Sequence, residues 1–272
     1  MIIEKLKKNR FIWNLNNVIS PKKRVEYFIS RIMFIPKYKR NTASIKSFKN
    51  IHKGKRCFII GNGPSLLPKD LDMLKNEITF ATNRIYNIFD KTEWRPTYYC
   101  MVDDGLLSDK KNNENVKRLV NSTKFLRMQK YLSIKNYYPE DIYIKTKWSR
   151  RYLKKPKFSM DSSKEVYTIA TVTYTAIQLA VYMGIREIYL LGVDNNYALE
   201  RNSKGEVVIN NNIKSYFSGN SEDQNSIAAR YEMDIVYEFL KEYSEKHDIR
   251  IYNSTRGGRL EVFERKKIES LL

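Results

Sequence analysis

The chain has 272 residues, of which 42% are hydrophobic and 29% charged, and its formal net charge is +20. This length is sufficient for one large α/β domain with a full core, or for such a domain preceded by an N-terminal extension, and the distribution of charge favours the second arrangement. The two cysteines, Cys57 and Cys100, form no CxxC or Cys/His pattern. This argues against a metal site built from these residues and fits two buried thiols in a reducing cytoplasm.

Residues 1–52 are predicted to form a basic, aromatic-rich extension. Residues 1–56 contain 16 Lys and Arg against two acids, so +14 of the net charge falls there, and aromatic side chains such as Trp13 and Phe28 are interleaved with the basic ones. No apolar run reaches the roughly 20 residues that span a bilayer, and the features of a signal peptide are missing. Polybasic segments with aromatic anchors bind anionic headgroups, so we expect residues 1–50 to hold a cytoplasmic protein peripherally at the inner face of the cell membrane.

Two other interpretations of the extension stay open. In the first, its helices are simply solvated, and its charge reflects a general richness of the chain in Lys, Asn, Ile and Tyr. In the second, it binds nucleic acid. Only the charge supports that reading, because the sequence has no zinc pattern, RNP-like aromatic strand or helix-turn-helix spacing.

From residue 53 onward, short apolar runs alternate with segments of helical period. The apolar runs predict strands at 56–60, 78–82, 98–102, 125–128, 143–144, 187–191 and 250–252. Helices are predicted at 68–74, 113–121, 172–182 and 227–247. Such alternation is typical of a doubly wound, mainly parallel Rossmann-like α/β sheet, so we expect residues 53–272 to form one domain of this class.

The first predicted strand ends in the sequence Gly61-Asn62-Gly63-Pro64-Ser65. The two glycines permit a tight turn whose backbone N–H groups, with the Asn62 amide and the Ser65 hydroxyl, face an anion such as a nucleotide phosphate. The alternative is a purely structural turn, because strand-turn-helix connections commonly contain Gly and Ser. The third glycine of a dinucleotide fingerprint and the Gly-Lys-Ser/Thr of a P-loop are missing, so neither NAD binding nor P-loop ATP hydrolysis follows.

Polar side chains also follow the later strands. Asn83 comes after the second strand, Asp103 and Asp104 after the third, and Asp194 after the sixth. In a doubly wound sheet these ends meet at one edge, where ligands bind. Three roles are open to the Asp103-Asp104 pair, namely contact with the nucleotide, binding of Mg²⁺ against phosphates, or capping of the following turn.

Two further segments supply candidate ligand contacts. Thr171 and Thr173 lie at the start of a predicted helix, where they either cap it or help its positive end to bind a phosphate or carboxylate. Arg256, followed by two glycines, is a candidate cation for the same groups, the alternative being a solvated arginine in a turn. Residues 197–225 are rich in Asn, Ser and Gly and too long for an ordinary connection, which predicts a lid over the site.

Four segments carry a resemblance to known enzymes, and they run in order from about Lys53 to Arg265. They are Ile59–Leu66, Ala81–Arg84, Thr171–Tyr174 with Gly184–Asp194, and Tyr252–Glu261. These segments resemble the bacterial sialyltransferases of glycosyltransferase family 42. They also resemble the related 6-hydroxymethylpterin diphosphokinase-like domain, which includes the motility accessory factor glycosyltransferases that modify flagellin.

The resemblance implies a GT-A-like variant of the Rossmann-like fold in which residues 53–272 form a catalytic domain that binds a nucleotide sugar. The residues that would contact the nucleotide sugar are Gly61, Asn62, Gly63, Ser65, Asn83, Asp103, Asp104, Thr171, Thr173, Asp194 and Arg256. In family 42 an acceptor hydroxyl attacks the anomeric carbon of a CMP-linked nonulosonic acid with inversion and without an essential metal. Two tyrosine hydroxyls stabilise the departing phosphate, and Tyr197 and Tyr216 approximate their positions.

The general base departs from the family pattern. The family's lid motif Gly-His-Ser reads Gly219-Asn220-Ser221 here, and an asparagine side chain cannot accept the proton. Glu222 or Asp223 would then have to act as the base, with a pKa raised by lid closure. The two histidines of the chain, His52 and His247, fall outside the lid.

We therefore expect a glycosyltransferase that moves a CMP-linked sialic or other nonulosonic acid onto a surface polysaccharide or glycolipid, as in capsule or lipopolysaccharide synthesis, without a metal cofactor. One alternative is a Mg²⁺-dependent diphosphokinase that passes pyrophosphate from ATP to a pterin-like alcohol. The other is a non-catalytic nucleic-acid-binding protein, which the charge alone favours. A homo-oligomer is compatible with each of these functions.

Overall fold

The computed structural model describes residues 41, 43–117, 119, 121–128, 140–149, 151–210, 212–218 and 227–272. Its centre is a seven-stranded sheet with the order β11-β8-β1-β2-β3-β4-β5, and every neighbouring pair is parallel. The strands are β1 (Arg56–Ile60), β2 (Thr79–Thr82), β3 (Tyr98–Met101), β4 (Thr123–Arg127), β5 (Ile142–Ile144), β8 (Glu187–Leu191) and β11 (Arg250–Asn253). The predicted fold class, an α/β protein with a parallel Rossmann-like sheet, is confirmed.

Both faces of the sheet are buried, which explains why its strands are nearly continuous apolar runs. In β1, Cys57 and Ile59 point into one apolar cluster, whereas Phe58 and Ile60 point into the other. This alternation follows from the two-residue period of a strand.

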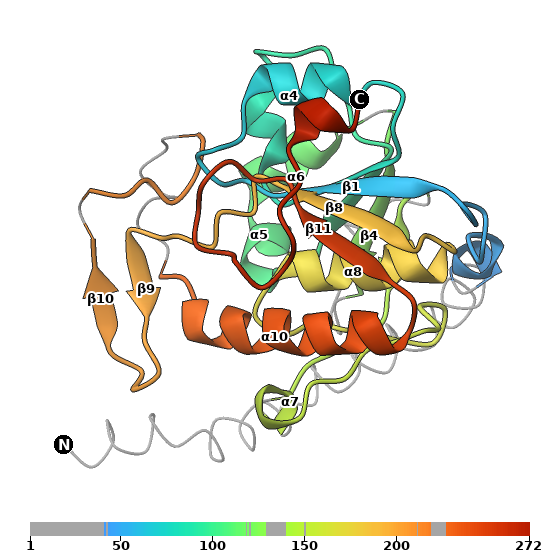
Figure 1. Ribbon diagram of the computed structural model, residues 1–272. Helices are drawn as coiled ribbons and strands as arrows, with labels where there is room; N and C mark the ends of the chain where they lie inside the picture. Colours follow the sequence, from blue (N-terminus) through green and yellow to red (C-terminus); the bar gives the residue numbers. More distant parts are fainter. Residues whose placement is uncertain are drawn as a thin grey trace, which may run out of the picture.

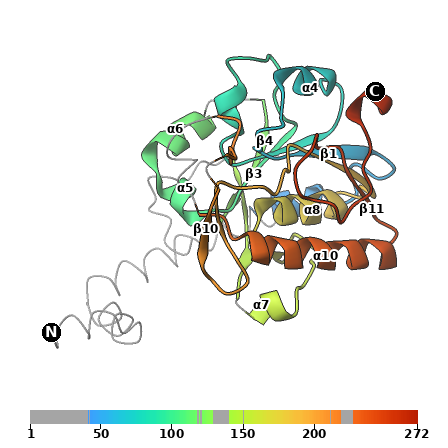
Figure 2. The same cartoon turned by 60° about the vertical axis from the view of Figure 1, so that its left-hand side comes forward.

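Helices cover the two faces (Figure 1). One face carries α8 (Val172–Tyr182) and α10 (Arg230–Lys246), and Figure 2 shows α8 enclosed between the sheet and α10. Ten of the 11 residues of α8 are buried, which is why this helix is apolar on nearly all sides. The other face carries α4 (Pro68–Met73), η1 (Ile85–Ile88), α5 (Asp104–Ser108), α6 (Lys110–Lys117) and η3 (Ile268–Ser270).

The direction of winding changes at β1. The chain passes from β1 through β2, β3 and β4 to β5 on one side, then returns to β8 on the other side of β1 and adds β11 outside it. The connections that follow β1 and β8 therefore lead toward opposite ends of the sheet, to β2 and to β11. In open α/β sheets, the crevice at such a switch point is where ligands bind.

Small elements absent from the sequence prediction lie outside the central sheet. β6 (Thr146–Lys147) pairs with β7 (Val166–Tyr167), and α7 (Arg151–Lys154) lies between them in the chain. The predicted lid contains an antiparallel hairpin of β9 (Leu199–Arg201) and β10 (Val207–Ile209), which projects from the body of the molecule in Figure 1.

The packed domain starts before the predicted boundary at residue 53. Asn41 is buried, and its Oδ1 accepts a hydrogen bond of 2.7 Å from the backbone N–H of Tyr143. Ile45 is 3% exposed, and the ring of Phe48 contacts that of Phe125 edge-to-face at 5.3 Å between centroids. Residues 1–40, which make up most of the predicted membrane segment 1–50, lie outside the described residues. Within the described part of the chain, no helix combines the length and apolarity that crossing a membrane requires.

Candidate active site

A cavity of about 560 Å³ lies at the carboxyl edge of the sheet, at the switch point between β1 and β8. Its walls come from the loops after β1, β2, β3 and β8, from the start of α8, and from the segment that follows the β9–β10 hairpin. Of the predicted site residues, eleven line it: Gly61, Asn62, Gly63, Asn83, Asp103, Asp104, Thr171, Thr173, Asp194, Tyr197 and Tyr216.

The two glycines after β1 allow its loop to pack against the loop after β8. A Cβ atom at Gly61 would lie 2.3 Å from the carbonyl oxygen of Gly192, and one at Gly63 would lie 1.8 Å from Oδ2 of Asp194. The N–H of Gly61 donates to Leu191 O and that of Gly63 to Gly192 O, both at 2.8 Å. These two N–H groups are thus engaged within the protein, and the contact of the turn with a phosphate stays a prediction.

Ser65 and Asp194 join the same two loops. The Ser65 hydroxyl donates to Asp194 Oδ2 at 2.8 Å, and the Ser65 N–H contacts Oδ1 at 3.3 Å. Burial raises the pKa of Asp194, which is 7% exposed, and the hydrogen bonds from Ser65 oppose that rise. Ser65 does not line the cavity, and its side chain contacts Asp194, which does.

Several oxygen atoms of the cavity wall are buried without a hydrogen-bond partner among the described residues. Asn62 donates from Nδ2 to Thr82 O at 2.9 Å, while its Oδ1 has no partner. The same holds for Asn83 Oδ1, Thr168 Oγ1 and Asn195 Oδ1. Buried oxygens of this kind are normally satisfied, so the wall fits a ligand that carries N–H and O–H groups.

The two carboxylates after β3 both have protein partners. Asp103 Oδ1 accepts a hydrogen bond of 2.8 Å from Leu106 N and caps α5, while Asp104 forms an ion pair of 3.2 Å with Arg127. Arg127 is the last residue of β4 and the cation among the described lining residues. Within the described residues, no group of three or more His, Cys, Asp or Glu side chains is placed to hold a metal ion.

The start of α8 points at the cavity in a constrained backbone conformation. Thr171 caps the helix by accepting a hydrogen bond of 3.2 Å from Thr173 N. Ala170, just before it, has a φ of 55°, and the lining residues Asn83 and Asn195 also have positive φ values. Left-handed backbone costs free energy in non-glycine residues and concentrates at functional sites.

The two predicted tyrosines meet in the cavity. The rings of Tyr197 and Tyr216 pack edge-to-face with centroids 6.3 Å apart, and the Tyr197 hydroxyl contacts Met233 Sδ at 3.4 Å. Burial raises the pKa of Tyr197 well above 10, so its hydroxyl stays protonated and is a hydrogen-bond donor at neutral pH.

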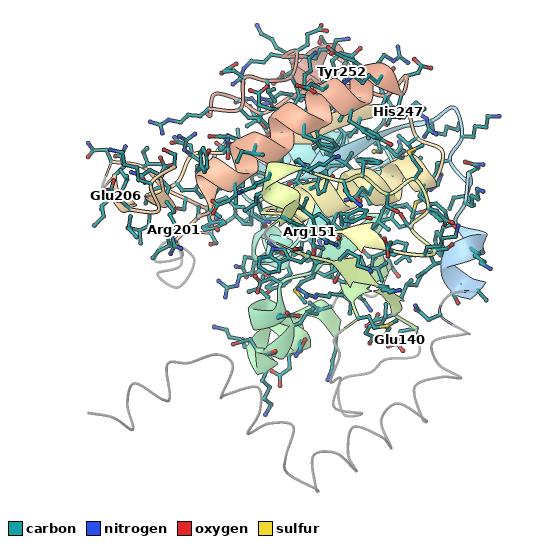
Figure 3. All side chains as sticks on the ribbon, turned by 90° about the horizontal axis from the view of Figure 1, so that it is seen from below. Glu140, Arg151, Arg201, Glu206, His247 and Tyr252 are labelled. Carbon is teal, nitrogen blue, oxygen red and sulfur yellow. The ribbon has the colours of Figure 1, made fainter. Side chains whose placement is uncertain are left out.

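The remaining described candidates do not line the cavity. Arg256 forms ion pairs with Asp70 and Glu269, which tie the C-terminal segment to α4, and its predicted contact with a ligand stays a prediction. His52 hydrogen-bonds the Tyr98 hydroxyl at 2.6 Å. His247 stacks on a tyrosine at the end of α10 remote from the β9–β10 hairpin, as Figure 3 shows. Glu222, Asp223 and Asn220 lie outside the described residues.

Sequence reasoning missed several lining residues. They are Thr82, Arg127, Trp148, Asn195, Ser215 and Tyr237. Arg127 had a readable signal, because it ends a strand that follows β3 and thus reaches the same sheet edge. Tyr237 had no such signal, because an aromatic residue in a helix is usually part of the hydrophobic core. Burial raises the pKa of Tyr237, and hydrogen bonds with Thr171 and Thr173 oppose that rise.

The fold and cavity define an α/β protein with a Rossmann-like parallel sheet and a polar cavity at its switch point. Residues 32–200 match the family described as 6-hydroxymethylpterin diphosphokinase MptE-like, and the chain belongs to this family. The resemblance found in the sequence motifs is thereby confirmed.

Two solved structures are similar to this chain. One is the MAf glycosyltransferase from Magnetospirillum magneticum AMB-1, with 16% identity over 86% of this chain and a TM-score of 0.49. This chain spans 39% of that protein's length. The other is the sialyltransferase CstII from Campylobacter jejuni, solved in complex with a substrate analogue, cytidine-5'-monophosphate. It has 17% identity over 78% of this chain and 85% of its own, and a TM-score of 0.41. No curated protein sequence matches the chain.

Proposed function

We propose that this protein is a glycosyltransferase whose donor is a nucleotide-activated sugar, a CMP-linked sialic or other nonulosonic acid. The acceptor is a hydroxyl group of a surface polysaccharide or glycolipid, as in the synthesis of capsule or lipopolysaccharide. The observation that carries the proposal is the convergence of eleven predicted residues, drawn from segments far apart in the chain, on one cavity at the switch point.

The cavity wall matches a nucleotide in chemistry. The unpartnered oxygens of Asn62, Asn83 and Asn195 accept hydrogen bonds, and the amino group of cytosine and the hydroxyls of ribose supply donors. The amino-terminal end of α8, with Thr171 at its cap, and the Arg127 guanidinium supply positive potential for a phosphate or a sugar carboxylate.

Tyr197 and Tyr216 line the cavity, and we assign them the stabilisation of the leaving group. In the proposed reaction the acceptor oxygen bonds to the anomeric carbon, the bond from that carbon to the phosphate oxygen breaks, and CMP leaves with the electron pair. A protonated tyrosine hydroxyl that donates a hydrogen bond to the departing phosphate stabilises the charge that develops there. The raised pKa of Tyr197 keeps that proton in place.

The acceptor proton needs a base. Glu222 or Asp223 remains the proposed base, and neither belongs to the described residues. Asp103, Asp104 and Asp194 line the cavity, but each is engaged by a capping hydrogen bond, an ion pair or Ser65 respectively. Those engagements favour the lid acids for proton transfer. No metal is required by this reaction, and residues 1–50 are proposed to hold the protein at the inner face of the cell membrane.

The second candidate function is that of a diphosphokinase. The adjacent carboxylates of Asp103 and Asp104 in the cavity favour it, because such a pair can bind Mg²⁺ against the phosphates of ATP. Binding of Mg²⁺ there carries an electrostatic cost, because Asp104 is already paired with the Arg127 guanidinium, and one oxygen of Asp103 is engaged at the N-terminus of α5. This cost places the diphosphokinase second.

A thermal-shift series separates the two candidates. CMP, CTP, UDP, GDP and ATP are added to the full chain, each with and without Mg²⁺. A ligand present at 100 times its Kd stabilises the folded state by about 2.7 kcal/mol. The glycosyltransferase proposal expects stabilisation by CMP and CTP that is indifferent to Mg²⁺. Stabilisation by ATP alone, and only with Mg²⁺, would instead support the diphosphokinase.

A further inference from the structure

A second cavity lies at the opposite edge of the sheet from the candidate active site. It has a volume of about 620 Å³ and is lined at the amino ends of β1, β8 and β11 by Arg56, Glu187 and Arg250. These strands are parallel, so their amino ends meet at the edge remote from the first cavity. The proposed glycosyl transfer uses none of these residues.

Positive charge dominates this second cavity. Among its nine lining residues, Glu187 is the acid and five are basic, namely Lys53, Lys55, Arg56, Arg186 and Arg250. Glu187 is already engaged, because Oε1 accepts a hydrogen bond of 2.8 Å from the Tyr189 hydroxyl and Oε2 pairs with Arg250 at 2.9 Å. Arg56 pairs with Glu77 at 2.7 Å, just outside the lining. The acids near the cavity therefore compensate only part of its charge.

The two lysines are the cations that remain available. Lys53 and Lys55 are exposed, and neither forms an ion pair with another described residue. A side chain at Gly54, between them, would meet no atom within 4 Å, so this part of the rim is open. Lysine ammonium groups on flexible stems adjust readily to phosphate oxygens.

The backbone holds these cations in place. The turn at residues 50–55 is fixed to the end of α8, because Asn50 N donates to Tyr182 O at 3.2 Å and His52 N donates to Met183 O at 2.9 Å. Gly184 has a φ of 91°, and a Cβ there would lie 3.0 Å from the Cα of Lys53. Arg186 is held beside the cavity by hydrogen bonds of 2.9 Å from its guanidinium to Val181 O and Ile185 O.

We propose that this second cavity is a binding site for a phosphate-bearing anion. Fixed guanidinium groups and free ammonium groups around one cavity are the donors that phosphate oxygens require. The phosphate comes either from the headgroup of an anionic lipid or from a soluble phosphate compound. Its position at the opposite edge means that the ligand does not compete with a nucleotide in the candidate active site. The proposal is independent of the proposed function.

The test compares two charge-matched variants of the full chain. Lys53→Glu/Lys55→Glu reverses the free charges of the second cavity. Lys110→Glu/Lys111→Glu makes the same change in net charge at exposed positions of α6 that line neither cavity. Binding of inorganic pyrophosphate is measured by calorimetry, and binding to phosphatidylcholine vesicles with and without phosphatidylglycerol is measured by cosedimentation. Unfolding temperatures verify that both variants fold, and Lys53→Gln/Lys55→Gln replaces the first variant if it does not.

The proposal expects the cavity variant to bind at least one probe about tenfold more weakly than the α6 variant, equivalent to about 1.4 kcal/mol. Loss of vesicle binding that depends on phosphatidylglycerol identifies a lipid headgroup. Loss of pyrophosphate binding with vesicle binding equal to that of the α6 variant identifies a soluble phosphate. Equal binding of both probes by the two variants would overturn the proposal.

Discussion

The hydroxyl of Ser65 donates a hydrogen bond of 2.8 Å to Asp194 Oδ2, which links the loop after β1 to the loop after β8. Ser65→Ala should lower the free energy of unfolding by about 1–3 kcal/mol at neutral pH, because a buried carboxylate loses a donor. Burial already raises the pKa of Asp194 above 3.8, and the variant should raise it further. The substitution should therefore have its full effect on stability at pH values where Asp194 is charged. The effect should shrink as pH falls through the folded-state pKa of Asp194.

Urea unfolding of wild type and Ser65→Ala at several pH values measures this effect. Ser270→Ala is a suitable control, because its exposed hydroxyl bonds only the nearby Lys267 carbonyl. A loss for Ser65→Ala that is the same at every pH would show that the carboxylate of Asp194 is not the partner that matters.

The glycines after β1 should be intolerant of any side chain. Gly63→Ala places a methyl group 1.8 Å from Asp194 Oδ2, and Gly61→Ala places one 2.3 Å from a backbone oxygen, so each should destabilise the fold by about 1–3 kcal/mol or more. Gly205→Ala meets no atom within 4 Å and carries only the cost of its positive φ, about 1–2 kcal/mol. Thermal unfolding compares the three. If Gly63→Ala were no less stable than Gly205→Ala, the close packing of the two loops would be refuted.

Tyr197→Phe should lower kcat by about 10–100-fold with a small change in KM, since one donor to the departing phosphate is lost. Tyr216→Phe should have a similar effect. Because burial raises the pKa of Tyr197 well above 10, its ionisation should not limit the rate of the wild type at neutral or mildly alkaline pH. Tyr231→Phe, at an exposed position of α10 outside the cavity, is the matched control.

Steady-state kinetics with a CMP-linked sugar supplies the measurement. A kcat for Tyr197→Phe equal to that of Tyr231→Phe would remove the leaving-group role from this hydroxyl.

The lid acids carry the prediction about the general base. Glu222→Gln or Asp223→Asn should lower kcat by roughly 10²–10⁴-fold with little change in nucleotide affinity. Asn220→His should raise the rate or move the pH optimum toward about 6.5, the ordinary imidazole pKa. Rates that none of these changes affects would assign the base to Asp103, Asp104 or Asp194 instead.

Truncation of the N-terminal segment should give different results at two positions. Removal of residues 1–40 keeps the contact of Asn41 with Tyr143 and should leave the fold intact while abolishing salt-sensitive binding to anionic vesicles. Removal of residues 1–50 also deletes Ile45 and Phe48 from the core and should cost about 2–5 kcal/mol of stability. Thermal unfolding and vesicle cosedimentation measure both. Vesicle binding that survives the shorter deletion would contradict the membrane role of residues 1–40.

The fold was readable from the sequence because its central elements have strong periodic signals. The apolar run at Arg56–Ile60 and the helical stripe at Val172–Tyr182 have the predicted bounds in the structure. The β9–β10 hairpin was missed because its strands have three residues each and β10 is fully exposed, so no buried face marks it. The sequence did mark its turn, because Asn202 is a residue type that favours turns. In the structure, Asn202 Oδ1 accepts hydrogen bonds from the backbone N–H groups of Lys204 and Glu206.

The candidate site was predictable where a residue ends a strand. Asn83, Asp103 and Asp194 could be placed at one edge because parallel strands bring their carboxyl ends together. The direction of each hydrogen bond could not be read in this way. The N–H groups of Gly61 and Gly63 bond the carbonyls of Leu191 and Gly192 because β8 lies beside β1, and that neighbour is more than a hundred residues away in the chain.

Binding of CMP, measured by calorimetry, tests the central claim most directly. Thr168→Val removes an unpartnered hydroxyl from the cavity wall without changing the size of the side chain. Thr175→Val removes an equally buried, unpartnered hydroxyl that does not line the cavity. Our account predicts that the wild type binds CMP, that Thr168→Val weakens binding about 5–10-fold, and that Thr175→Val leaves it unchanged. A wild type that binds no CMP, or equal affinities for all three proteins, would contradict the claim that this cavity holds the nucleotide of a sugar donor.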